Sequence, residues 1–370
     1  MKSINITIGE VNFSINCDNT ELTNILHKEF SYYSYNSDSQ NSVEINVSTN
    51  QHKTRGIKSQ NPKFIQLNDK NTFSYFGSTL AYTMEVEKKI TIDAYISTYK
   101  NPLLRFVRKW LNMGFNNRIE RAGQIIHENL IVPLFYFFQG HGIVHASSFS
   151  NKKRGMLISG TGGVGKTSLE IALCSMQENI FLSDDICIVK NEKVYPNFSF
   201  PKIYAYNLVN DPKLKHTILK KRNLLDQLQW KVKSLKGKDK VRRRISPEIL
   251  YGEITSQPVP FEAVITLVKS NTDKLMLKEI SPETSAKLNI EIIKNEYAEW
   301  FKVLRWVDIN QHYLSSPNEI FSVDNRLREM EQSLLKTFST GKTYILEIPL
   351  SIPHDVFKKE ASKIIMNLMD

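Results

Sequence analysis

Cysteine and long apolar runs are both scarce in this chain. Three cysteines in 370 residues are too few and too scattered for a disulfide framework or a zinc site: Cys17, Cys174 and Cys187. The longest apolar run, Leu130 to Phe138, covers nine residues and contains Pro133, so it is far too short to span a membrane. The N-terminus lacks the apolar stretch of a signal peptide. These absences predict a soluble, cytoplasmic protein without a membrane partner.

Most of the chain also lacks an excess of positive or negative charge, although the net charge is +11. Thirteen Lys or Arg against three Asp lie between Asp211 and Arg244, an excess of ten, so the remainder is nearly neutral. We call residues 211–245 the basic segment. A local excess of this kind favours a polyanionic or acidic partner, although a solvated lysine-rich loop is an equal alternative. We expect the segment to be a mobile, exposed lid, with no nucleic acid as partner; a homo-oligomer is left open.

A chain of 370 residues suggests two domains or one large domain with an elaboration, and 41% hydrophobic residues are enough for real cores. Residues 1–100 alternate in short runs and predict a strand-rich domain with one helix, Asp18 to Phe30. Residues 101–140 predict a helical connection. Residues 141–370 predict a catalytic domain, in which Ala263 to Val268 and Lys274 to Glu279 are expected to form an antiparallel pair. The expected fold class is therefore α/β with a mixed sheet.

A complete G-x-x-x-x-G-K-[ST] motif is the most informative feature of the chain. It follows an apolar run typical of a buried strand, Gly155 to Ser159, and precedes a stretch with helical spacing. Strand, glycine turn and helix N-terminus direct backbone N–H groups at an anion. We predict a nucleoside triphosphate site made by Gly160, Thr161, Gly162, Gly163, Val164, Gly165, Lys166, Thr167 and Ser168.

Within that motif, Lys166 is expected to neutralise the β- and γ-phosphates, and the Thr167 hydroxyl to bind Mg²⁺. Asp184 and Asp185 follow 17 and 18 residues after Thr167, inside an apolar strand. A loop–helix–strand unit of this length returns the chain beside the phosphate loop. One carboxylate can then bind Mg²⁺ while the other accepts a proton from an attacking hydroxyl. His145, on the strand before the loop, is close enough to line the same site, although a hydrogen-bonded core histidine is the commoner role.

Three segments together resemble the catalytic core of HPr kinase/phosphorylase and, more closely, the HPr kinase-related proteins: Val144 to Ser147, the strand and loop from Gly155, and Phe181 to Asp185. That family shares a nucleotide-binding fold with ATP-dependent phosphoenolpyruvate carboxykinase. The resemblance implies ATP- and Mg²⁺-dependent phosphorylation of a hydroxyl. By position it implies Asp184 as the base, Asp185 as a metal ligand and His145 in the site. From the charge of the basic segment we also expect Arg242, Arg243 and Arg244 to approach the transferring phosphate or an acidic part of the acceptor.

The loop ends Lys166-Thr167-Ser168, where HPr kinases usually have Lys-Ser-Glu, and the second HPr kinase signature is absent. These departures favour an acceptor other than HPr. The leading hypothesis is a kinase for serine of a peptide or small protein, such as a lasso-peptide precursor, with an acidic acceptor as one option. A sugar or amino-acid hydroxyl kinase comes second, and a nucleotide-dependent regulatory ATPase third. A carboxykinase is least favoured. The choice between ATP and GTP stays open.

Overall fold

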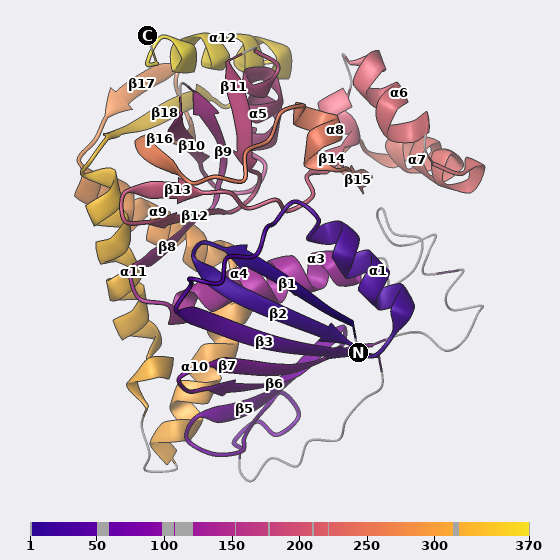
Figure 1. Ribbon diagram of the computed structural model, residues 1–370. Helices are drawn as coiled ribbons and strands as arrows, with labels where there is room; N and C mark the ends of the chain where they lie inside the picture. The colour runs from indigo at the N-terminus through magenta and orange to yellow at the C-terminus, as the bar shows by residue number, and fades with distance from the viewer. Residues whose placement is uncertain are drawn as a thin grey trace.

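The computed structural model describes residues 2–49, 59–97, 107, 121–151, 153–176, 178–208, 211–220, 222–313 and 318–369. Two large β-sheets with flanking helices occupy the lower and upper halves of Figure 1. This mixed architecture confirms the predicted α/β class.

The N-terminal sheet has the strand order β1-β2-β3-β7-β6-β5-β4. β3 runs parallel to β2 and β7, and the remaining neighbours are antiparallel. Alternating apolar residues are buried on one face, as the predicted strands required, and Val11, Phe13 and Ile15 extend the pattern to β2. The strands are β1 Lys2–Ile8, β2 Val11–Cys17, β3 Asn41–Ser48, β4 Ile65–Leu67, β5 Thr72–Phe76, β6 Leu80–Val86 and β7 Ile90–Ile96.

Helices cover this sheet. α1, Thr20–Glu29, begins where the Asn19 side chain accepts hydrogen bonds from two backbone N–H groups. A second, mostly buried helical run lies against the sheet in Figure 1: α3 Ala122–Ile126, η1 His127–Ile131, α4 Val132–Leu134 and η2 Phe135–Phe137. Residues 101–106 and 108–120, predicted to be helical, lie outside the described residues. The described residues 122–137 are helical.

η1 is a single turn of π-helix, and Pro133 accounts for it. Pro133 has no N–H to donate to the carbonyl of Asn129, so the regular ladder is interrupted there. The Val132 N–H bonds instead to the carbonyl of His127, five residues back. This leaves the carbonyl of Glu128 without its usual helical partner.

The second sheet has the order β11-β9-β10-β16-β13-β12-β8, with β18 beside β16 and β17 beside β18. The predicted pairing of the strands near residues 263 and 276 is wrong. β16 and β17 each pair with β18, one parallel and one antiparallel, so β18 lies between them. The strands are β8 His141–Val144, β9 Ala146–Asn151, β10 Arg154–Ser159, β11 Asn179–Ser183, β12 Cys187–Lys190, β13 Lys193–Tyr195, β16 Val259–Ser270, β17 Met276–Glu279 and β18 Lys342–Pro349.

Two groups of helices enclose this sheet. α5, Lys166–Cys174, packs against α12, His354–Met366. Both helices contribute buried side chains to one hydrophobic cluster with this sheet. On the other side α9 Pro282–Glu296, α10 Ala298–Tyr313 and α11 Val323–Phe338 contact the larger core cluster, which also contains the N-terminal sheet. In Figure 1 α10 and α11 run from the upper sheet down beside the lower one. These helices therefore join the two sheets through one hydrophobic core.

The basic segment is folded. It contains α6 Pro212–Lys220, α7 Leu224–Lys236 and β15 Arg242–Arg244, and β15 pairs with β14 Lys202–Tyr204. Outside this segment lie three further short helices: η3 Ala205–Leu208, α8 Pro247–Tyr251 and η4 Glu319–Phe321. Arg243 is fully buried. Its guanidinium contacts the carboxylate of Asp226 and lies over the ring of Trp230. The expectation that this run of cations stays out of a core is wrong for Arg243, because Asp226 supplies the counter-charge that makes burial tolerable.

A disulfide framework and a membrane span are the two features that the sequence excludes. All three cysteines are buried and carry free thiols. Among the described residues, no helix is both long enough and apolar enough to cross a bilayer.

Candidate functional site

The phosphate-loop motif lies between β10 and α5, as its pattern predicts (Figure 1). Gly163 and Gly165 have φ angles of +82° and +109°, which side-chain-bearing residues rarely adopt. A Cβ atom on Gly165 would also come within 2.6 Å of the Phe357 ring. Buried Val164 anchors the turn in the core beside α12. The loop's glycines are therefore required by backbone conformation and by space.

Lys166 is buried, and its ammonium group donates to the carbonyls of Gly160 at 2.8 Å and Thr161 at 3.0 Å. Burial lowers the pKa of Lys166, and the carboxylates of Asp185 and Asp184 oppose that shift. The ammonium therefore lies inside the loop, facing the two acids that the sequence singled out.

Asp184 and Asp185 occupy the break between β11 and β12. Asp184 is buried, and its Oδ1 accepts hydrogen bonds from Thr167 Oγ1 at 3.1 Å and Ser147 Oγ at 3.0 Å. Burial, together with the neighbouring charge of Asp185, raises the pKa of Asp184. A carboxylate and a hydroxyl in direct contact form a pair of hard oxygen ligands.

Asp185 turns in another direction because its backbone has a φ of +74°. Its carboxylate lies 3.0 Å from Lys202 Nζ and 3.0 Å from His145 Nε2. Desolvation raises the pKa of Asp185, but the Lys202 ammonium and the hydrogen bond from His145 outweigh it and hold that pKa well below its usual range. Adjacent acids in the sequence thus have opposite pKa shifts and different neighbours.

Glu296, at the end of α9, is a site residue that sequence reasoning missed. Its Oε1 accepts from the backbone N–H of Gly162 at 3.1 Å and lies 3.4 Å from His145 Nδ1. An anionic oxygen thus already binds a loop N–H, which is the interaction expected of a phosphate. No local motif around Glu296 could have identified it, since the contact depends on the packing of α9 beside the loop.

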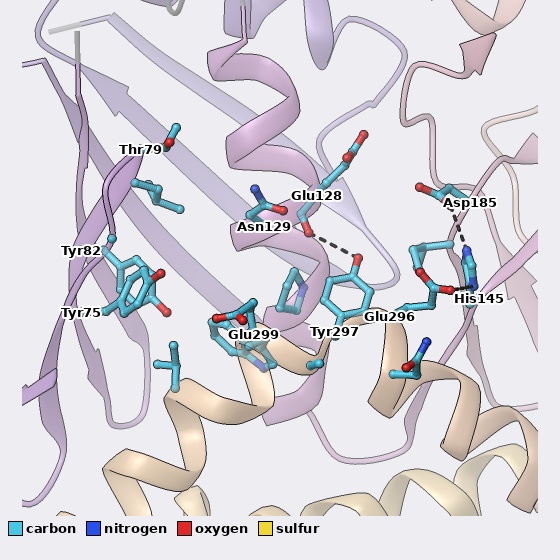
Figure 2. A pocket seen from close by; sticks show the side chains of 18 of the residues that line it. Tyr75, Thr79, Tyr82, Glu128, Asn129, His145, Asp185, Glu296, Tyr297 and Glu299 are labelled. Atoms are coloured by element: carbon cyan, nitrogen blue, oxygen red, sulfur yellow. Dashed lines mark hydrogen bonds and ion pairs between the residues drawn. The ribbon is translucent and has the colours of Figure 1, made fainter. Parts of the chain in front are cut away.

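Lys202 and Glu128 were missed for the same reason. Lys202 Nζ lies 2.7 Å from Glu128 Oε2, so it connects η1 to Asp185. The Glu128 carbonyl freed by the π-turn accepts a hydrogen bond from the Tyr297 hydroxyl at 3.3 Å. Figure 2 shows Glu128, Tyr297 and Glu296 between Tyr75 and Tyr82 on one side and the His145–Asp185 pair on the other.

Two cavities meet at this group of side chains. One, of about 270 Å³, is lined by loop residues and by Asp184, Tyr204 and Arg242. The other, of about 640 Å³, extends from His145 past Glu128 to Tyr75 and Tyr82 of the N-terminal sheet (Figure 2). The lining residues common to both are His145, Asp185, Lys202 and Glu296. A group bound at the loop would therefore face a group bound in the larger cavity across Asp185.

The three arginines of β15 have three different environments. Arg242 lines the loop cavity and donates to the Tyr204 hydroxyl at 2.8 Å. Arg243 is buried in its pair with Asp226, and Arg244 forms a bidentate pair with Glu29 of α1 at 2.6 and 3.1 Å. Only Arg242 of the three is placed to meet a ligand in the loop cavity.

Ser168, the last residue of the predicted nucleotide site, is buried and lines the loop cavity. Its Oγ accepts from Asn207 Nδ2 at 2.6 Å and lies 3.0 Å from His354 Nε2. Within the described residues, no group of three or more His, Cys, Asp or Glu side chains could hold a metal ion. A metal at this site would thus depend on Thr167, one carboxylate and oxygens of the ligand, which is the usual arrangement for Mg²⁺ bound with a nucleotide.

No protein-family model and no curated protein sequence matches the chain. Among solved structures, the chain is similar to the HPr(Ser) kinase/phosphatase from Coxiella burnetii, with 12% sequence identity and a TM-score of 0.26. The alignment covers 62% of this chain and 99% of that chain. With a TM-score this low, function has to be inferred from the residues of the site themselves.

Proposed function

We propose that this protein is an ATP- and Mg²⁺-dependent kinase that transfers the γ-phosphoryl group to a hydroxyl, with serine of a peptide or small protein as the leading acceptor. The observation that carries the proposal is the meeting of the phosphate-loop cavity and the larger cavity at Asp185 and His145. A donor and an acceptor bound in the two cavities would face each other beside a carboxylate. A cytoplasmic location, where ATP is available, belongs to this proposal.

The donor side of the site is supplied by residues 160–168. Backbone N–H groups of the loop and the Lys166 ammonium bind the phosphates, and Arg242 adds a second positive charge in the same cavity. Thr167 and Asp184 are the residues that would hold Mg²⁺, since their oxygens already lie 3.1 Å apart. The ion would neutralise charge on the β- and γ-phosphate oxygens.

On the acceptor side, Asp185 is the proton acceptor that the contacts favour. The acceptor oxygen forms a bond to the γ-phosphorus, the bond from that phosphorus to the β,γ-bridging oxygen breaks, ADP leaves, and the hydroxyl proton passes to the Asp185 carboxylate. His145 orients that carboxylate through its contact at 3.0 Å. A strong base is unnecessary, because phosphoryl transfer depends mainly on positioning and charge stabilisation. This assignment reverses the one implied by family position, with Asp184 as base and Asp185 as metal ligand.

In this proposal residues 141–370 supply the catalytic domain, and residues 1–100 supply part of the acceptor wall through β5 and β6. The Glu296 carboxylate that now accepts from the Gly162 N–H would leave when phosphate oxygens bind, because both are anions and compete for the same donor. Displacement of an internal carboxylate lowers the apparent affinity for the nucleotide, since its contact has to be given up first.

The test is incubation of the full chain with ATP, Mg²⁺ and single-serine peptides, followed by intact-mass measurement of each peptide. We expect a gain of one phosphoryl group with the wild type and, with Lys166→Ala, a rate lower by about 10² to 10³. Exposed Lys287→Ala, on α9, is the matched control and should act like the wild type. Phosphorylation of sugars or amino acids alone would favour the small-molecule kinase, and ATP hydrolysis without any acceptor would favour the regulatory ATPase. Normal turnover by folded Lys166→Ala would reject the site.

A further inference from the structure

The larger cavity is acidic. Its lining includes the carboxylates of Glu128, Asp185, Glu296 and Glu299 and a single ammonium, that of Lys202. Lys202 is already bound to two of these carboxylates, at 2.7 and 3.0 Å. Two carboxylates, those of Glu296 and Glu299, therefore remain in the lining without an ammonium partner there.

In Figure 2 Glu299 lies between Tyr297 and the Tyr75 and Tyr82 rings, away from the His145–Asp185 pair. Its side chain is 81% exposed, so this carboxylate stands at the open side of the cavity. An ion pair at 3.8 Å joins it to Lys302, which is also more than half exposed, and solvent weakens that contact. The Tyr75 and Tyr82 rings lie 5.2 Å apart between centroids. Tyr75 and Glu299 both line the cavity, and desolvation, together with the charge of Glu299, raises the pKa of Tyr75. A carboxylate beside aromatic faces is an environment that binds organic cations.

Trp300 supplies an independent sign of a ligand. It lines the same cavity, only 7% of it is exposed, and its indole Nε1–H has no hydrogen-bond partner among the described residues. A buried donor left unpaired is unfavourable, and a ligand carbonyl or hydroxyl that reached this N–H would satisfy it. The cavity thus offers a place for an acceptor oxygen at Asp185 and for a positive charge near Glu299, with an unpaired donor, the Trp300 N–H, in its wall.

We propose that the phosphoryl acceptor is a hydroxyl-bearing cation, with its hydroxyl at Asp185 and an ammonium or guanidinium group against Glu299 and Tyr75. This inference rests on the proposed function and adds the charge of the substrate to it. It reverses the sign that the basic segment suggests, because the cations of that segment are placed outside this cavity. A metal ion is a poor alternative occupant, since no group of three or more suitable ligands occurs among the described residues.

Peptides and small amino alcohols both supply this chemistry, so the experiment carries both arms. The peptide arm uses a single-serine peptide with lysine, N-acetyl-lysine or glutamate placed at successive positions on either side of the serine. The small-molecule arm compares 3-amino-1,2-propanediol with its N-acetyl derivative. Acetylation removes the charge and keeps the shape, so it isolates the electrostatic contribution. KM and kcat are measured for phosphoryl transfer, and binding is measured by calorimetry.

In at least one arm, the cationic acceptor should have a KM about two- to fivefold below that of its acetylated partner, because the pairing carboxylate is exposed. The kcat should be nearly unchanged, since the charge binds away from the reacting atoms. Glu299→Gln should remove most of this preference, and Glu299→Lys should shift it toward the glutamate peptide. Glu291→Gln is the matched control, since Glu291 is exposed on α9 and pairs with Lys294 outside the cavity.

Failure of this inference can be separated from failure of the proposed function. Equal KM values for charged and acetylated acceptors in both arms would overturn the cationic acceptor and leave the kinase intact. A preference that survives Glu299→Gln unchanged would overturn the assignment to Glu299. Tighter binding of the lysine peptide than of its acetylated partner, without any phosphoryl transfer, would support the cation site and reject the kinase.

Discussion

The two cavities that meet at Asp185 are built in different ways. The smaller one comes mostly from one continuous part of the chain, residues 145–207, and most of its contacts to a phosphate would be made by backbone groups and Lys166. The larger one is assembled from β5, β6, η1 and the junction of α9 with α10. The first cavity therefore depends on local conformation, whereas the second depends on how the two sheets pack against the same helices.

Their charges differ as well. The smaller cavity is balanced, since Lys166, Lys202 and Arg242 line it beside three carboxylates, Asp184, Asp185 and Glu296. The larger cavity has four carboxylates in its lining and one ammonium, that of Lys202. In the proposed reaction a cationic acceptor would enter the more acidic cavity, and the nucleotide would enter the one with more cations. The residues common to both cavities would then carry the transfer step.

The largest expected effect concerns that boundary. Asp185→Asn should lower turnover by about 10² to 10⁴, with ATP affinity and Mg²⁺ requirement nearly unchanged, because a proton acceptor is lost. Asp184→Asn should instead raise the Mg²⁺ concentration needed for half-maximal rate, because Asp184 contacts Thr167. Mg²⁺ titrations of both variants separate the roles. A raised requirement in Asp185→Asn alone would restore the assignment implied by family position, and full activity of both would make the pair structural.

The second effect compares two neighbouring arginines in stability. Arg243→Ala should lower the free energy of unfolding by about 3 to 5 kcal/mol, because Asp226 would keep a buried charge without its partner. Arg242→Ala, one residue away and partly exposed, should cost less than about 1 kcal/mol. Urea unfolding of the full chain measures both. Replacing the pair together, as Arg243→Met with Asp226→Leu, should recover much of the loss. Equal stability of the two single variants would contradict the buried-pair interpretation.

These contrasts also show what could be predicted from the sequence. The loop could be singled out because its glycines encode backbone geometry within one short motif. The two aspartates and His145 could be placed beside it because the strands that carry them directly adjoin the loop and its helix in the sequence. Glu296, Lys202 and Glu128 could not be found, since each belongs to the site only through contacts between distant segments.

The same limit explains the errors in the fold. β18 lies between β16 and β17, and alternation alone says nothing about which strands are neighbours. The cationic composition of the basic segment predicted exposure, but the counter-charge of Asp226 decided the burial of Arg243. α9 and α10 carry no catalytic motif and could not be assigned from the sequence, yet their junction lines the larger cavity.

A third prediction concerns the link between the two halves of the molecule. Arg244 holds the carboxylate of Glu29, and His127 lies 3.5 Å from it. Desolvation raises the pKa of Glu29, but Arg244 and His127 outweigh it and lower that pKa from 4.5 to about 2. Since the folded pKa is depressed, the stabilisation is complete above about pH 4.5 and is lost as the pH falls toward 2. The size of the shift corresponds to about 3 kcal/mol at neutral pH.

Urea unfolding at several pH values measures this link. The stability difference between wild type and Glu29→Gln should be largest at neutral pH and should shrink below pH 4.5. Glu21→Gln, an exposed change in the first turn of the same helix, should show no such pH dependence. A difference that stays constant down to pH 3 would mean that the Glu29–Arg244 pair does not couple folding to protonation.

The smallest expected effect tests whether the two cavities are electrostatically independent. Arg242→Ala should weaken ATP binding about fivefold, because Arg242 is partly exposed and its charge is screened. The fall in ATP affinity between about 50 and 300 mM NaCl should become shallower in this variant. Binding of the lysine peptide should not change in Arg242→Ala, since Arg242 does not line the larger cavity. The salt dependence of peptide binding should instead become shallower in Glu299→Gln. If Arg242→Ala weakened peptide binding and left ATP binding unchanged, the basic segment would be the acceptor site, and an acidic acceptor would replace the cationic one.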